Sequence, residues 1–156
     1  MEIENKIKIG IITDTASDLT NEMYQNLNIE RIPFYVEING KTYQSGKDIT
    51  VDELFAVSKK EKKIPRTSQI TPAHFIKYFK EYLEKYQEII YISLGSGFSG
   101  TFNNAYLAAT ELGLDRVHVI DSHNLSSGEG LLVLKACKLR DLGKSVAEII
   151  SEVERC

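Results

Sequence analysis

Apolar residues along this chain form short runs that alternate with longer segments in which they recur every three or four positions. Residues 6–14 first alternate polar and apolar and then become continuously apolar, as expected of a strand that enters a buried parallel sheet. Similar runs predict strands over residues 29–38, 88–94 and 116–121. Pro33 lies within the second run and indicates an edge or irregular strand, because proline donates no ladder hydrogen bond.

Helix signals fill the segments between these runs. Leu19, Met23 and Leu27 have helical spacing after a polar stretch at residues 17–20 that we expect to hold the helix cap. Further helices are predicted over residues 51–60, from 72 onward, over 101–112, over 128–142 up to Gly143, and after Ser145.

Three of these helices carry explicit start signals. Thr50 and Glu53 form a capping box, with Ile49 and Leu54 placed as a hydrophobic staple. Thr71 is placed to cap a helix with Pro72 at its first position, and Ile70 is expected to pack on Phe75. Ser145 with Glu148 is expected to cap the last helix.

Asn39-Gly40 supplies the two positive-φ positions of a tight hairpin, so residues 41–43 are expected to pair back antiparallel. The strands otherwise alternate with helices through short loops. This alternation predicts an α/β fold, a three-layer α/β/α arrangement around a mostly parallel sheet. Ligands bind at the carboxyl ends of strands in such sheets. We therefore expect the loops after Ile12, Ile92 and Ile120 to converge on a site.

Composition narrows the class of protein. The chain has 156 residues, 42% apolar and 26% charged, which fits one globular domain and excludes a disordered or fibrous chain. Its formal net charge is -3 and its Lys and Arg residues are scattered, so no nucleic-acid partner is expected. No signal-peptide pattern and no apolar run of about 18 residues occurs, which predicts a cytoplasmic protein without a transmembrane segment. Cys137 and Cys156 lack metal-ligand spacing, and Cys137 is expected in the core.

Candidate chemistry lies in three segments where hydroxyl and glycine residues precede a helix: residues 67–72, 96–101 and 121–128. Hydroxyl donors and the free N–H groups of helix starts could together hold a carboxylate or phosphate. Helix capping alone would explain Thr50, Thr71, Ser126 and Ser145. It explains Thr67, Ser96 and Ser99 less well, because each lies among more donors than one helix start requires. We therefore expect ligand contact from at least one of these three.

Enzyme signatures are weak by comparison. Residues 97–101 nearly match the Gly-x-Ser-x-Gly nucleophile elbow of hydrolases, but Thr101 replaces the last glycine. The acid and base available after Ser99 are Asp121 and His123, which we expect to point in different directions from one loop. No dinucleotide or phosphate-loop motif occurs, and His74 and His118 offer no metal site, so neither a cofactor nor a metal is expected.

Taken together, the order and spacing of five segments resemble the DegV family of bacterial fatty-acid-binding proteins. These segments are residues 13–19, 46–49, 67–69, 96–101 and 121–130. The resemblance implies a protein that is not an enzyme. It implies that the protein holds one long-chain fatty acid, with the acyl tail in an apolar tunnel and the carboxylate on hydroxyl residues. It further implies that the protein presents the acid to a separate ATP-dependent kinase, which makes an acyl phosphate for phospholipid synthesis.

Carried over by motif, Thr67 and Ser99 are the first candidates for the carboxylate, with Ser96 and Ser68 next. The supporting loop residues would be Gln69, Gly97, Phe98, Gly100, Thr101, Asp121 and Ser122. This chain departs from the family at Gly95, where a second serine is frequent.

The resemblance also implies a two-domain protein, whose C-terminal domain adds an arginine and a histidine near the head group. Residues 1–156 then correspond to the N-terminal domain, with the C-terminal domain absent from this chain. Half a tunnel would leave an apolar face, through which we expect self-association. Two alternatives stay open: an enzyme acting on a small phosphorylated or carboxylated metabolite at the same loops, and an interaction module without a ligand.

Overall fold

The computed structural model describes residues 7–17, 19–38, 40–44, 53, 56, 59–60, 66–68, 70–97, 100–124 and 127–155. A parallel sheet of four strands forms its centre, in the order β2-β1-β6-β7. The strands are β1 (Ile7–Asp14), β2 (Ile29–Ile32), β6 (Tyr86–Ser93) and β7 (Val117–Asp121). The bounds of β1, β6 and β7 agree with the runs predicted from the sequence, whereas β2 is shorter than the run predicted over residues 29–38.

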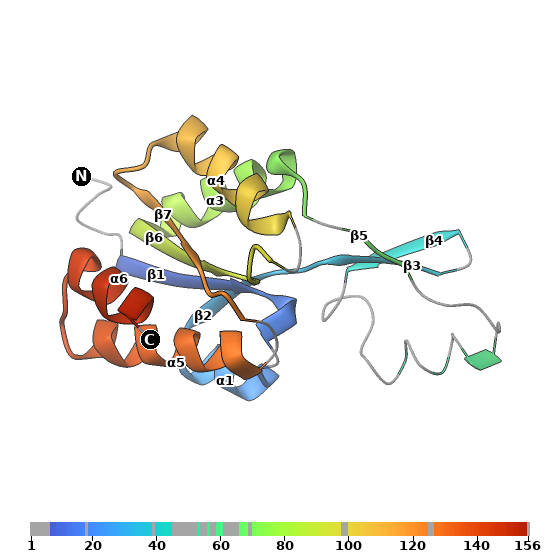
Figure 1. Ribbon diagram of the computed structural model, residues 1–156, viewed down its shortest axis with the longest axis horizontal. Coiled ribbons are helices and arrows are strands. Elements are labelled where there is room, and N and C mark those ends of the chain that lie inside the picture. The colour runs from blue at the N-terminus through green and yellow to red at the C-terminus, as the bar shows by residue number, and fades with distance from the viewer. Residues whose placement is uncertain are drawn as a thin grey trace.

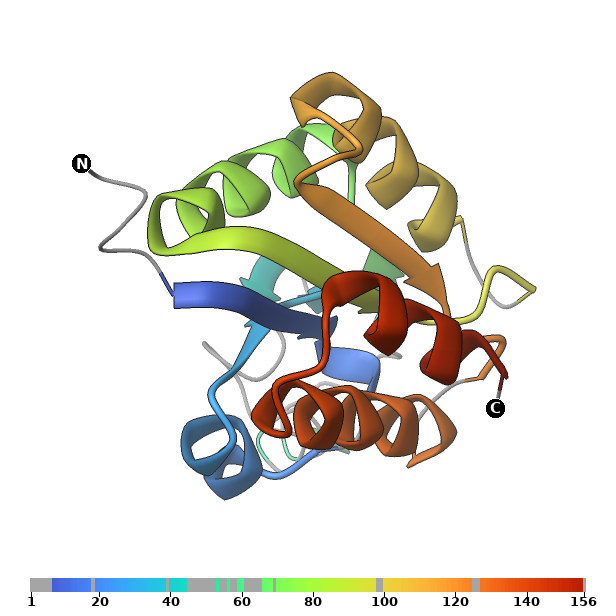
Figure 2. The same cartoon turned by 90° about the vertical axis from the view of Figure 1, so that its left-hand side faces the viewer.

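Helices cover both faces of this sheet, as Figure 2 shows. On one face lie α3 (Pro72–Lys85) and α4 (Thr101–Leu112). On the other lie α1 (Asn21–Asn26), α5 (Ser127–Asp141) and α6 (Val146–Arg155). The predicted three-layer α/β/α fold is therefore confirmed.

Successive side chains of the central strands point to opposite faces of the sheet and so build one core on each face. In β6, Ile89 and Tyr91 pack with α3 and α4, while Ile90 and Ile92 pack with α5 and α6. Strands buried on both faces must be apolar throughout, which is why the sequence shows continuous apolar runs rather than alternation here. Cys137 is buried in the second core, as predicted.

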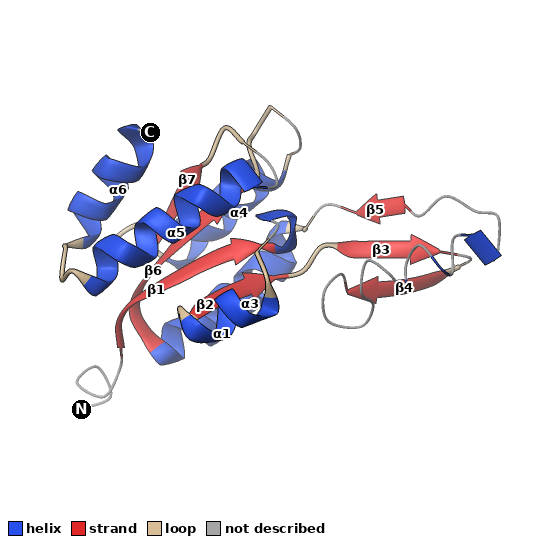
Figure 3. Cartoon of the chain, turned by 90° about the horizontal axis from the view of Figure 1, so that it is seen from below, coloured by secondary structure: helices blue, strands red, loops and turns tan. Residues whose placement is uncertain are grey.

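A second, antiparallel sheet extends beyond the carboxyl ends of the parallel strands, as seen in Figures 1 and 3. It consists of β3 (Tyr35–Ile38), β4 (Lys41–Gln44) and β5 (Arg66–Ser68), in the order β4-β3-β5. The hairpin predicted at residues 39–40 joins β3 to β4, and Gly40 there has a φ of 79°.

The prediction of one strand over residues 29–38 was wrong, because that segment divides between the two sheets at Pro33. Pro33 has no N–H to donate, and the Phe34 N–H donates instead to Thr15 Oγ1 at 3.2 Å. The ladder therefore ends at Ile32. β2 is an edge strand, as Pro33 indicated, while β3 lies in the middle of the second sheet.

Helix caps follow the sequence wherever they lie in described residues. Thr20 accepts a hydrogen bond from the Met23 N–H at 3.1 Å, and Thr71 accepts one from the His74 N–H at 3.2 Å. Ser145 Oγ likewise accepts from the Glu148 N–H at 3.2 Å. The helix predicted over residues 51–60, its cap at Thr50 and the cap at Ser126 lie largely or wholly outside the described residues.

Candidate functional site

The carboxyl edge of the parallel sheet has a topological switch point between β1 and β6. The chain leaves β1 for α1 and β2 on one side, and leaves β6 for α4 and β7 on the other. The two connections diverge at this point, and open α/β sheets bind ligands at such switch points. The loops after β1, β6 and β7 meet at this edge, as the sequence predicted.

Backbone hydrogen bonds hold the loops after β6 and β7 together. The Gly95 N–H donates to the Asn124 carbonyl oxygen at 2.8 Å, and the Ser122 N–H donates to the Ser93 carbonyl oxygen at 3.2 Å. A side chain at Gly95 would meet the Asn124 backbone N at 2.8 Å, so this loop contact requires glycine.

Asp121 adds a charged contact between the same loops. Its Oδ1 atom accepts hydrogen bonds from the Ser96 N–H at 3.0 Å and the His123 N–H at 2.9 Å. Partial burial raises the pKa of Asp121, but bonds from the Ser96 hydroxyl and these two N–H groups outweigh it and lower the pKa below its ordinary value. The Ser96 hydroxyl is thus already engaged with Asp121, although the side chain is exposed toward the site.

His123 does not point away from Asp121, so that expectation was wrong. Its Nδ1 atom lies 3.6 Å from Asp121 Oδ2, because a left-handed backbone at His123, with φ of 56°, folds the loop back. Ser122 is buried, and its hydroxyl donates to the Asn124 carbonyl oxygen at 2.9 Å while accepting from the Asn124 N–H at 3.1 Å. Ser122 therefore stabilises the loop from within.

The candidates from the other loops lie close by. Thr67 and Ser68 are in β5, with backbone partners Val36 and Tyr35 in β3. From β5 the chain reaches the buried Ile70, whose carbonyl oxygen accepts a bond from Asn104 Nδ2 in the first turn of α4 at 3.0 Å. The segment after β5 thus meets the start of α4 rather than the opposite edge of the sheet.

The start of α4 has no side-chain cap. The helix begins after Gly100, which has no side chain to accept from the first turn, and Thr101 is buried in that turn. Gly97 is exposed in the preceding turn. A helix start of this kind has backbone N–H groups available to an anion. Gln69, Phe98 and Ser99 lie outside the described residues, as do the side chains of Thr67 and Ser68, so their part in the site stays a prediction.

A buried polar cluster beneath these loops was not among the predicted site residues. Asp14 Oδ2 accepts from the Tyr91 hydroxyl at 2.6 Å and the Leu94 N–H at 3.0 Å. Thr13 Oγ1 lies 2.9 Å from Glu129 Oε2 and 3.0 Å from the Ile92 carbonyl oxygen. The available sequence signals were the polar end of an otherwise apolar strand and a glutamate between two glycines at a helix start.

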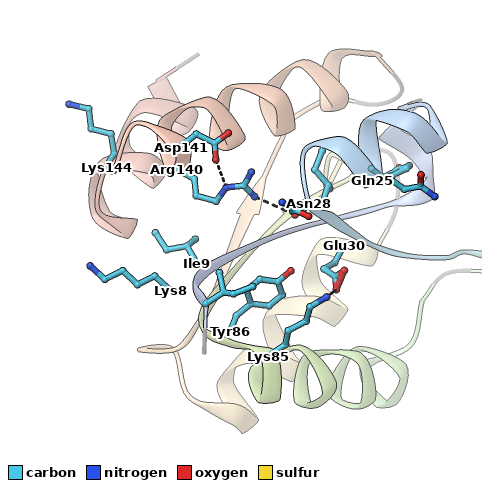
Figure 4. Close-up of a pocket in the computed structure, with 14 residues that line it drawn as sticks. Lys8, Ile9, Gln25, Asn28, Glu30, Lys85, Tyr86, Arg140, Asp141 and Lys144 are labelled. Atoms are coloured by element: carbon cyan, nitrogen blue, oxygen red, sulfur yellow. Dashed lines mark hydrogen bonds and ion pairs between the residues drawn. The ribbon is translucent and has the colours of Figure 1, made fainter. Parts of the chain in front are cut away.

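A larger cavity of about 660 Å³ lies at the opposite, amino end of the sheet (Figure 4). Two of its cations have partners in the fold: Arg140 donates to the Leu27 carbonyl oxygen at 2.6 Å and pairs with Asp141, and Lys85 pairs with Glu30 at 3.4 Å. Cations at helix carboxyl ends also complement the helix dipole. These residues are therefore explained by the fold itself.

Neither a metal centre nor a membrane span is found in the described parts of the chain. No group of three or more His, Cys, Asp or Glu side chains is arranged there to hold a metal ion. His118 Nε2 instead lies 3.0 Å from Glu88 Oε1 on the neighbouring strand. Of the helices described, none has both the length and the apolar character needed to cross a bilayer.

Comparison with known proteins identifies the relatives of this fold. The family described as an uncharacterised protein of the DegV family matches residues 8–156. A DegV domain-containing protein of Clostridium acetobutylicum is 42% identical over 146 residues, which cover 94% of this chain and 52% of the relative.

Two solved structures show the same architecture. A DegV family protein from Thermus thermophilus, described for its fatty acid binding, has a TM-score of 0.85 at 33% identity, covering 96% of this chain and 53% of that one. DegV from Bacillus subtilis, described as a fatty acid binding protein, has a TM-score of 0.87 at 29% identity, with 96% and 54% coverage. The chain thus spans about half the length of the relatives it matches.

Proposed function

Since this chain belongs to the DegV family, we propose that it forms one side of a binding site for a long-chain fatty acid. The carboxylate would lie at the switch point, against the loops after β5 and β6 and the start of α4. The acyl tail would extend into an apolar tunnel completed by the other half of a longer protein. Two structural relatives carry fatty acid binding in their descriptions, which supports this ligand class.

One observation carries the proposal: the hydroxyl-bearing segments lie at the same edge of the sheet. The Asn104 bond to Ile70 joins the start of α4 to the segment after β5, and the Asp121 bond to Ser96 joins the two loops beyond it. Backbone N–H groups and hydroxyls without a fixed positive charge suit a single carboxylate better than a phosphate.

Thr67 and Ser99 are the proposed carboxylate donors, with Ser68 and Ser96 contributing. Ser96 has a competing partner, because the Asp121 carboxylate already accepts from it. We expect Ser96 to bind the ligand through rearrangement of this contact, and Thr67 and Ser99 to contribute more to affinity.

The proposed role is carriage without catalysis. The protein would present the bound acid to a separate ATP-dependent kinase, as the family resemblance implies. In this arrangement the loops shield the tail and expose only the carboxylate oxygens. The second candidate, an enzyme for a small phosphorylated or carboxylated metabolite, would use the same N–H groups but would need no apolar tunnel.

Replacement of Thr67 or Ser99 by alanine tests the proposal. Each should weaken fatty-acid binding by about 1.5–3 kcal/mol, the usual contribution of a hydrogen bond to a charged group. The measurement is titration with palmitate below its micelle concentration, with Thr110→Ala on the exposed face of α4 as the matched control. Unchanged affinity in both variants would remove these residues from the site.

Native mass spectrometry of protein purified from cells separates the two candidate functions. An adduct that organic extraction identifies as a fatty acid supports the lipid-carrier proposal. A small phosphorylated metabolite in its place would favour the enzyme. Addition of a cellular fatty-acid kinase and ATP to the loaded protein should then yield acyl phosphate, and failure to do so would contradict the carrier role.

A further inference from the structure

Asp14 is a fully buried carboxyl group that the proposed ligand contacts do not use. It is the last residue of β1 and lies at the switch point, beside the end of β6. A buried charge is costly unless hydrogen bonds compensate it. The Tyr91 hydroxyl at 2.6 Å and the Leu94 N–H at 3.0 Å provide that compensation through one oxygen, Oδ2.

Tight packing holds the Tyr91 hydroxyl, which donates to Asp14, in place. Its side chain is fully buried in β6, and its ring centroid lies 5.2 Å from that of Phe75 and 5.9 Å from that of Phe79 in α3. Close packing on this scale leaves the phenol little freedom to move. The Asp14 carboxylate is therefore located with respect to the core, and so is whatever else it binds.

Leu94 is the first residue after β6, so its N–H is where the strand gives way to the loop. The next two residues hold the loop after β7: Gly95 donates to Asn124 at 2.8 Å and Ser96 donates to Asp121 at 3.0 Å. Three consecutive backbone N–H groups are thus fixed, the first by the end of β1 and the next two by the end of β7 and the loop after it. The hydrogen bond from the Leu94 N–H to Asp14 connects these three residues to the core of the sheet.

Glu129 is a second buried carboxyl group beside Asp14. Gly130 lets α5 approach closely, since a Cβ there would lie 2.5 Å from the Ser17 carbonyl oxygen, and this brings the fully buried Glu129 near Asp14. Burial, and then the charge of Asp14, raise the pKa of Glu129 well above its ordinary value. Glu129 therefore stays protonated at neutral pH and adds no second charge beside Asp14.

We propose, on the basis of the proposed function, that Asp14 is a positioning residue of the head-group site. Its carboxylate fixes the Leu94 N–H and thereby holds the turn at residues 95–97, with Ser96 and the approach to α4, in the geometry that receives the ligand carboxylate. Asp14 does not touch the ligand. It acts through the loop, so its removal should impair recognition of the carboxylate more than recognition of the acyl chain.

The test is Asp14→Asn in the 156-residue chain, with two readouts. Amide hydrogen exchange at Leu94 and Ser96 should accelerate by about tenfold or more, because the charged acceptor is lost. Affinity for palmitate should fall by about tenfold, while affinity for methyl palmitate, which lacks the charged head group, should change by less than about threefold. A loss of fold stability alone would weaken the binding of both probes equally.

Tyr91→Phe and Tyr24→Phe form a matched pair that keeps the test valid where Asp14→Asn does not fold. Each removes one buried phenol hydroxyl and its bond to a neighbouring side chain, Asp14 for Tyr91 and Ser17 for Tyr24, at 2.6 and 2.8 Å. Tyr91→Phe should lower the preference for palmitate over its methyl ester by about threefold or more, since Asp14 loses the Tyr91 hydroxyl as a hydrogen-bond donor. Tyr24→Phe should leave that preference unchanged.

Each result bears on the proposal. The proposal would be overturned if amide exchange at Leu94 and Ser96 kept its wild-type rate in Asp14→Asn. Equal losses of affinity for palmitate and methyl palmitate would also overturn it, as would equal effects of the two tyrosine variants on the preference for palmitate. If the unmodified chain binds neither probe, the binding comparison is made in the chain extended with the C-terminal half of the Clostridium acetobutylicum relative, and absence of binding there would contradict the fatty-acid proposal. Hydrogen exchange at Leu94 and Ser96 then decides the role of Asp14 independently.

Discussion

Glu129 lies in the first turn of α5 with its carboxyl group fully buried near Asp14. Burial and the charge of Asp14 both oppose ionisation, so the folded protein keeps Glu129 protonated at pH values where the unfolded chain releases the proton. The folded state then binds more protons than the unfolded state. Folding stability must fall as pH rises above the ordinary glutamate pKa of 4.5.

Glu129→Gln should remove this dependence, because glutamine matches the shape of the protonated acid and does not titrate. Between pH 5.5 and 8.5, wild type should lose up to about 1.4 kcal/mol per pH unit relative to the variant. Urea unfolding at several pH values measures this. Glu111→Gln, on an exposed position of α4, is the control and should follow wild type. Parallel curves for wild type and Glu129→Gln would contradict the assignment of the proton.

At the scale of elements, α3 is the helix that joins the second sheet to the parallel sheet. It begins at Thr71 and Pro72, directly after Ile70, whose carbonyl oxygen is bound by Asn104. The start of α3 and the start of α4 are thus linked through one residue. We therefore expect the N-cap residue Thr71 to stabilise α3 and to help position the neighbouring Ile70, which contacts α4.

Thr71→Ala should destabilise the protein by about 1 kcal/mol, because the His74 N–H loses its acceptor at the helix start. Thr110→Ala removes the same atoms from an exposed position inside α4 and should change stability by less than about 0.5 kcal/mol. The difference between the two urea midpoints measures the cap. Equal effects would show that Thr71 stabilises α3 in some other way.

At the scale of the whole molecule, the chain matches about half the length of its relatives. An acyl tail that is half in water gains only part of its transfer free energy, which is about 0.8 kcal/mol per buried methylene. We therefore propose that the other half of a full-length relative supplies the second wall of the tunnel and a cation for the carboxylate.

Extension of the chain with the C-terminal half of the Clostridium acetobutylicum relative should strengthen binding of a long-chain acid. Titration of both proteins with palmitate below its micelle concentration tests this. Equal affinities at the submicromolar level, about 8 kcal/mol or more, would show that the present 156 residues suffice.

Local sequence determined most of the elements. Continuous apolar runs predicted the buried strands, and capping residues such as Thr20, Thr71 and Ser145 predicted the helix starts, because both depend on residues within one or two turns of the chain. The same signals, with the order of the hydroxyl motifs, placed the candidate site at the carboxyl ends of the strands.

Tertiary structure alone decided which distant residues meet. Thr13 and Glu129 are 116 positions apart, and Asp14 and Tyr91 are 77 apart, so their contacts depend on the strand order and on the close approach of α5. The division of residues 29–38 between two sheets likewise depended on a bond from Phe34 to Thr15. Local patterns encode which face is apolar and where a helix begins, whereas the pairing of buried charges is fixed only when the layers pack.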